Sequence, residues 1–99
     1  MKCYAIRPED KEGDFIMIKN ELEDLQKFVG GYIEVVPTYF TNVVVICDEE
    51  GRLKGKPYCC FISGLEFVGP VLLAGVNNGE FTDVPFTDAD LIRNILGVK

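Results

Sequence analysis

Residues 20–36 read NELEDLQKFVGGYIEVV, a stretch that predicts a helix ending at a glycine pair and leading directly into a strand. Asn20 can cap the helix amino terminus, and Glu23 completes a pattern similar to a capping box. Gly30 can turn left-handed and end the helix. Tyr32–Val36 is rich in β-branched residues, as is typical of a strand. The apolar residues of the helix share one face: Leu22, Leu25, Phe28 and Val29.

A second short amphipathic helix is predicted from Thr87 to Leu96, with Asp88 and Asp90 in its first turn and Gly97 at its end. Asn77–Gly79 has the composition of a hairpin turn. Tyr58–Ile62 is apolar but ambiguous. Further strands are predicted for short segments of β-branched and aromatic residues: Lys2–Arg7, Phe15–Lys19, Asn42–Cys47, Val71–Val76 and Glu80–Val84. We therefore expect one small α+β domain over residues 1–99, a mostly antiparallel sheet partly covered by two helices.

The amino-acid composition argues against several classes of function. The 99 residues include 16 acids, 10 bases and no histidine, and the net charge is −6. An acidic chain argues against direct nucleic-acid binding, because phosphate neutralisation needs clustered Lys and Arg. A chain without histidine has no Ser-His or Cys-His nucleophile pair, no His general base and no His-ligated metal. We expect no enzyme activity, no catalytic residue, no metal and no cofactor.

The four cysteines are expected to be free thiols that pack like small apolar side chains. They are Cys3, Cys47, Cys59 and Cys60, and no C-x-x-C spacing occurs among them. No apolar signal segment follows Met1, and no run approaches the roughly 18 apolar residues of a membrane span. A reduced, cytoplasmic setting without membrane contact is therefore expected.

The only local positive patch is the basic strip, which we define as Arg52, Lys54 and Lys56. In an extended chain this period-two spacing places three cations on one side, where they could bind a nucleotide-like anion or an acidic partner surface. The alternative is a solvated edge strand whose charges prevent pairing with another edge. The acidic segment Asp48–Glu50 before it lacks the ligand spacing of a calcium loop and is expected to be an ordinary turn.

Aromatic residues offer the other candidate sites. Tyr39 and Phe40 lie in the connection after Pro37 and could anchor a partner or fold back over the core. Alternation along the preceding strand places Tyr32 and Glu34 on the same face. That carboxylate could line a pocket beside the tyrosine, or it could mark the solvent side of a half-buried strand.

Several segments resemble a family of proteins of about one hundred residues, catalogued as domain of unknown function three-eight-four-six. The similarity begins at Gly30–Val36, continues through Cys47–Gly55, and includes Gly69–Gly75 and Phe86–Asp90. Asp48 stands where members often have Asn. The resemblance implies a bacteriophage or mobile-element setting and supplies no catalytic residues.

Together these observations favour a non-enzymatic binding module, with a counter-defence inhibitor acting by protein–protein interaction as one form of it. The expected partner is a bacterial host protein, and a homodimer is left open. The alternative is a protein that binds or sequesters a small nucleotide-like anion through the basic strip, with Tyr32 or Tyr39 stacking on the ligand.

Overall fold

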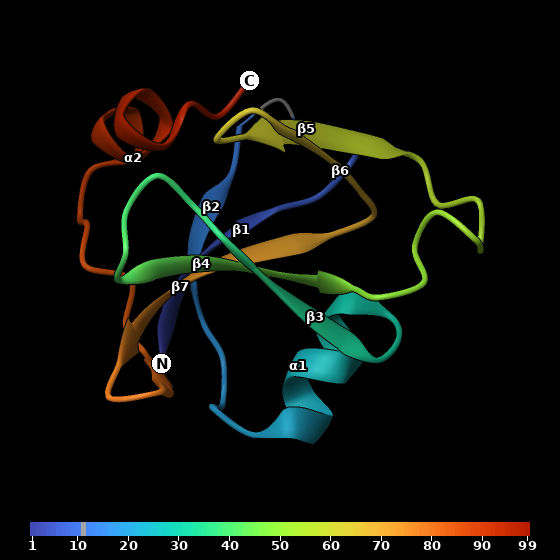
Figure 1. Cartoon of the computed structure of the whole chain (residues 1–99), viewed down its shortest axis with the longest axis horizontal. Helices are drawn as coiled ribbons and strands as arrows, with labels where there is room; N and C mark the ends of the chain where they lie inside the picture. Colours follow the sequence, from blue (N-terminus) through green and yellow to red (C-terminus); the bar gives the residue numbers. More distant parts are fainter. Residues whose placement is uncertain (11) are drawn as a thin grey trace.

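The computed structural model, which describes residues 1–10 and 12–99, contains a six-stranded antiparallel sheet (Figure 1). Five strands follow the order β2-β1-β7-β4-β3, and β8 pairs with β7. The strands of this sheet are β1 (Lys2–Ile6), β2 (Asp14–Met17), β3 (Ile33–Pro37), β4 (Val43–Asp48), β7 (Val71–Asn77) and β8 (Glu80–Thr82). The α+β class predicted from the sequence, with its mainly antiparallel sheet and two short helices, is confirmed.

Both faces of this sheet are covered. Helix α1 (Leu22–Val29) lies on one face, while α2 (Ala89–Leu96) and a separate hairpin of β5 (Tyr58–Ile62) and β6 (Leu65–Val68) lie on the other (Figure 1). A central strand covered on both sides needs apolar residues at every position. This explains the unbroken apolar sequence of most of β7 and most of β4.

The core is divided into two clusters by the alternation of side chains along the strands. The cluster on the hairpin side contains Val45 of β4 and Leu73 of β7, packed with residues of β5, β6 and α2. The cluster on the α1 side contains Ile46 and Leu72, packed with Leu25 of α1. Each helix therefore depends on the sheet face it covers, as expected for helices of two turns.

The predicted helix ends are confirmed, and the predicted starts are wrong by one or two residues. Gly30 ends α1 and Gly97 ends α2, both in the left-handed conformation. Helix α1 begins after Glu21, which forms no side-chain cap; Asn20 lies one residue before the cap position, and its side-chain nitrogen donates to the Phe81 carbonyl. Helix α2 is capped by Asp88, whose carboxylate accepts hydrogen bonds from the amides of the first turn.

Strand β6 was not predicted. It is four residues long and is joined to β5 through Ser63 and Gly64, both with positive φ. Two-residue hairpin turns with positive φ usually contain Asn, Asp or Gly at the first position and Gly at the second. Serine is uncommon in that conformation, so only the glycine of this turn indicates a hairpin. The turn at Asn78 and Gly79, also with positive φ, is confirmed.

The strand predictions otherwise agree with the structure to within two residues at each end. Residue 11 lies outside the described residues. No helix in the described ranges is both long enough and apolar enough to cross a membrane.

Candidate partner-binding surface

The loop after β4 is organised around Asp48, the last residue of that strand. Its side chain is only 1% exposed, and one carboxylate oxygen accepts from Lys54 Nζ at 2.9 Å and from Lys56 Nζ at 2.7 Å. The other oxygen accepts from the Glu50 amide at 2.9 Å. Burial alone would raise the pKa of the Asp48 carboxyl, but the hydrogen bonds from Lys56, Lys54 and the Glu50 amide outweigh it and lower that pKa to about 2.

The same two lysines also bind the carboxyl end of α1. Lys54 Nζ donates to the Gly30 carbonyl at 3.0 Å, and Lys56 Nζ donates to the Val29 carbonyl at 2.6 Å. The last carbonyls of a helix have no partner within the helix and carry its negative dipole end. Asp48, Lys54 and Lys56 thus join β4, the loop and α1, and we call these three residues the ion-pair clamp.

The basic strip is not an extended strand, so the expectation that its cations lie on one side is wrong. Residues 49–55 form consecutive turns, with the Lys54 amide donating to the Glu50 carbonyl and the Lys56 amide to the Gly51 carbonyl. Arg52 turns away from the lysines and pairs with Glu66 of β6 at 3.0 Å. The strip therefore forms no common anion site, since each of its cations has a partner within the chain.

Strand β3 forms one end of the main sheet, and its backbone faces β4 on one side only. The register is continuous from the pair Ile33↔Asp48 to the pair Pro37↔Val44. Glu34 opposes Cys47, a residue of the hairpin-side cluster, so it lies on the hairpin face, where it is exposed. Val35 lies on the α1 face and is 45% exposed. Strand β3 therefore has an open edge and exposed side chains on both faces.

A groove of about 350 Å³ opens on the hairpin face between β3, the end of β4 and β6. Its apolar walls include Val36, Leu65 and Phe67. The carboxylates of Glu34 and Glu49 also line it, and neither forms an ion pair within residues 1–10 and 12–99. The groove is thus apolar with an acidic margin.

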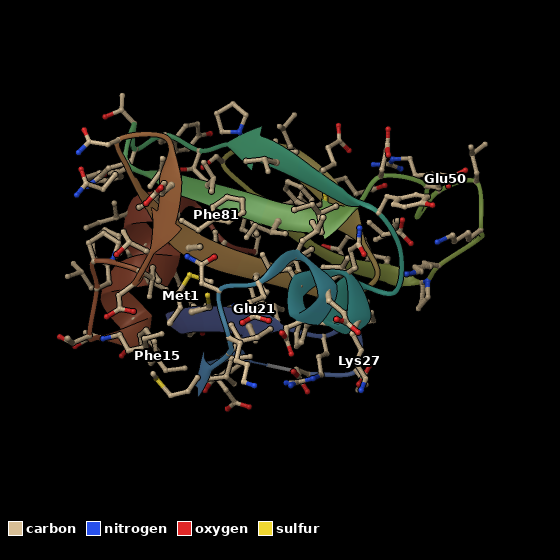
Figure 2. The ribbon with its side chains drawn as sticks, turned by 90° about the horizontal axis from the view of Figure 1, so that it is seen from below. Met1, Phe15, Glu21, Lys27, Glu50 and Phe81 are labelled. Atoms are coloured by element: carbon tan, nitrogen blue, oxygen red, sulfur yellow. The ribbon has the colours of Figure 1, made fainter. Side chains whose placement is uncertain are left out.

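A second, shallower depression lies on the α1 side of the same loop. It is lined by Tyr32, which is 66% exposed, together with residues of the α1 carboxyl end, Glu50 and Lys54. Figure 2, viewed from the α1 side, places Lys27 on α1 and Glu50 on the loop that projects beyond β4. Tyr32 and Glu34 therefore lie in different hollows, although they belong to the same strand region.

Tyr39 and Phe40 lie in the loop at the other end of β3. Tyr39 is 67% exposed, and its amide donates to Ser63 Oγ at 3.1 Å. Phe40 is turned inward, with its ring edge on Phe86 at a centroid distance of 5.7 Å. Of the two predicted alternatives, folding back therefore describes Phe40, while Tyr39 presents most of its ring to solvent.

The cysteines are packed in the core rather than gathered into a site. Cys3, Cys47 and Cys60 are buried, and Cys59 is half-buried. Burial raises the pKa of the Cys3 and Cys47 thiols to about 11, which keeps them protonated and unreactive at neutral pH. Within the described ranges, no group of three or more Cys, Asp or Glu side chains is placed to hold a metal ion.

The ion-pair clamp and the groove were not predicted from the sequence. Asp48 could have been noticed as a lone acid at the end of an otherwise apolar strand, six and eight residues before two lysines. The groove depends on β6, which was not predicted. Its residues come from segments that are distant in sequence and carry no motif.

The family model described as "Domain of unknown function (DUF3846)" matches residues 1–96, and the chain belongs to this family. Comparison with the curated proteins and with the solved structures found no match. The family resemblance seen in the sequence is therefore confirmed over nearly the whole chain.

Proposed function

We propose that this chain is a non-enzymatic binding module of a bacteriophage or other mobile element, and that it acts in the cytoplasm of the bacterial host by binding a host protein. One observation carries the proposal. Large apolar side chains are exposed along β3 and its two flanking loops, namely Tyr32, Val35, Tyr39 and, to a lesser degree, Phe40. Exposed aromatic side chains are typical of interface anchors, and here they flank both ends of β3. We call these four residues the β3 surface.

Charge favours a basic partner. The chain carries a net charge of −6, and complementary charge speeds association with a positively charged surface. A host protein with a basic surface would satisfy this condition, and inhibition of a host defence protein is one outcome of such binding.

The pairing of the basic strip argues against the alternative, a nucleotide-like anion held by the same cations. Arg52 is engaged by Glu66, and both lysines are engaged by Asp48 and by carbonyls of α1. An anion would have to displace these partners, at the cost of leaving the buried Asp48 carboxylate unpaired.

The proposal is tested by capture of proteins from a host lysate with the immobilised wild-type chain and two variants. In Tyr32→Ser/Tyr39→Ser the two most exposed aromatic residues of the β3 surface are removed. The control is Met17→Ser, which removes a 75% exposed apolar side chain from β2 at the opposite end of the sheet.

We expect wild type and Met17→Ser to retain the same host protein and the double variant to lose it. Equal retention by all three, or retention of nothing by the wild type, would contradict the proposal. A rise in melting temperature with nucleotides would instead support the anion-binding alternative, because a ligand that binds only the folded state raises its stability.

A further inference from the structure

We propose that the open edge of β3 pairs with an extended, basic segment of the partner, which adds a strand to the main sheet. This inference rests on the proposed function and specifies how the β3 surface would bind. It is carried by three features: the direction of the β3 backbone groups, the position of the groove, and the charge of its margin.

The backbone groups of β3 that face away from β4 follow from the hydrogen-bond pattern. The Glu49 amide donates to the Tyr32 carbonyl at 2.8 Å. In an antiparallel pair the residues alternate in direction, so the N–H and C=O groups of Glu34 also face β4. The N–H and C=O groups of Ile33 and Val35 then point outward, and no hydrogen bond within residues 1–10 and 12–99 uses them.

The usual protections against strand addition are few on this edge. Natural edge strands carry lysines, bulges or prolines that block pairing. Strand β3 contains no Lys or Arg, and its register with β4 is continuous. Pro37 is its only proline, and it stands at the last position, where it would end the pairing rather than prevent it.

The groove determines which side chains of an added strand would contact the protein. In antiparallel pairing, opposed residues place their side chains on the same face. Every second side chain of the added strand would therefore lie on the face that carries Glu34 and Val36, where the groove opens. A basic residue suits the position beside Glu34, and an apolar residue suits the position beside Val36.

The acidic margin identifies the occupant as basic. Glu34 and Glu49 have no cationic partner in the described part of the chain, while the other two carboxylates of the groove are already paired, Glu66 with Arg52 and Asp48 with the two lysines. A second copy of this chain is a poorer occupant, because it would bring another net charge of −6 and the same acidic groove. We therefore infer a partner segment in which Lys or Arg alternates with apolar residues on one face.

The test uses a capped synthetic peptide of about nine residues, which is within the usual length of a strand. Every second position carries Lys or Val in turn, and Thr fills the positions between them. Binding is measured by calorimetric titration and by amide hydrogen exchange of the protein. We expect the amides of Ile33 and Val35 to become protected in the complex. A peptide that binds without protecting these two amides would overturn the inference.

Methylation of peptide nitrogens provides a matched pair of probes. The Thr positions would oppose Ile33 and Val35, so their amides would face β3, whereas the amides of Lys and Val would face solvent. Methylation at two Thr nitrogens should weaken binding at least tenfold, on the order of one lost hydrogen bond or more. Methylation at one Lys and one Val nitrogen should weaken it much less. Equal effects of the two methylated peptides would overturn the strand pairing.

Charge is tested on the protein side. Glu34→Gln/Glu49→Gln should weaken binding of the Lys-Val peptide about fivefold at low salt, as the loss of two exposed charge pairs would. High salt should remove most of that difference. The control Glu23→Gln/Glu80→Gln removes the same number of exposed charges elsewhere and should bind as the wild type does. An unchanged affinity in the first variant would overturn the assignment of a basic occupant.

Failure of this inference is distinguishable from failure of the proposed function. If the lysate partner depends on Tyr32 and Tyr39 while the Lys-Val peptide does not bind, the module binds through side chains alone and the strand pairing is wrong. If the peptide binds with protection of Ile33 and Val35 while no host protein is retained, the edge is a strand receptor and the proposed host partner is wrong.

Discussion

The loop that holds the basic strip and the neighbouring strand β3 line the same groove, but they use their polar groups in opposite ways. In the loop, three cations that look available in the sequence are engaged by Asp48, Glu66 and the end of α1. In β3, a sequence that looks like an ordinary core strand leaves backbone groups and apolar side chains without partners among the residues that the structure describes. Charges close in sequence are therefore poor guides to binding when a buried acid lies nearby.

The comparison predicts that the loop matters for stability and β3 for binding. Replacing Asp48 with Ala should have the largest effect, because it removes the buried carboxylate that both lysines bind and leaves them without their charged partner. We expect the free energy of unfolding to fall by about 3 kcal/mol. Urea unfolding followed by circular dichroism measures it.

The control for this change is Glu49→Ala, one residue further along the same loop, where the side chain is exposed and forms no ion pair within the described ranges. It should change the unfolding free energy by less than about 0.5 kcal/mol. Similar losses of unfolding free energy in the two variants would show that the ion-pair clamp contributes no more stability than an exposed side chain of the same loop.

Lowering the pH should remove the stability that the ion-pair clamp contributes. The pKa of the Asp48 carboxyl is lowered in the folded state from 3.8 to about 2. A lowered folded-state pKa contributes stability that is fully present above about pH 4 and is lost as the pH falls toward 2, by about 2 kcal/mol. Unfolding measured across this window should show that loss in the wild type. Asp48→Asn should lack this part of the pH dependence. If its unfolding free energy changes with pH as that of the wild type does, the assignment to Asp48 is wrong.

The two lysines should differ from each other. Lys56 has the shorter contacts, and its side chain is 19% exposed against 39% for Lys54. Lys56→Met should lower the unfolding free energy by about 1–2 kcal/mol. Lys54→Met should lower it by about 0.5 kcal/mol, because solvent weakens an exposed pair. The reverse order in urea unfolding would mean that Lys54, not Lys56, holds the end of α1.

Changes on the β3 surface should have the smallest effect on stability. Tyr32→Ser and Tyr39→Ser each remove a side chain that is about two-thirds exposed, so each should shift the unfolding free energy by less than about 0.5 kcal/mol. The melting temperatures of these variants should stay close to that of Met17→Ser. A loss comparable to that of Asp48→Ala would show that β3 is part of the core and would break the comparison.

Local signals predicted most of the fold, because they depend on neighbours in sequence. Gly30 and Gly97 end helices since a left-handed residue is needed there, and the strands follow from short β-branched segments. The start of α1 was misplaced because the cap position is Glu21, while Asn20 lies outside the helix and bonds to the Phe81 carbonyl, 61 residues away. A contact between residues so distant in sequence is not visible in a single sequence.

The site was predicted only in its parts. Tyr32, Glu34 and Tyr39 were singled out as candidates from the sequence, and all three are exposed, but nothing in the sequence shows that Tyr32 and Glu34 face different hollows. The basic strip was misread because period-two spacing has meaning only in an extended chain. Its residues form turns instead, since Gly51 and Gly55 favour them and Asp48 draws the lysines inward.

Amide hydrogen exchange of the chain without any ligand tests the open edge of β3 most directly. The amides of Glu34 and Val36, which face β4, should exchange at least about a hundredfold more slowly than those of Ile33 and Val35, which face outward. Equal protection of all four amides would contradict this, because it would mean that the outer edge of β3 is already covered in solution, as in a homodimer that pairs through this strand.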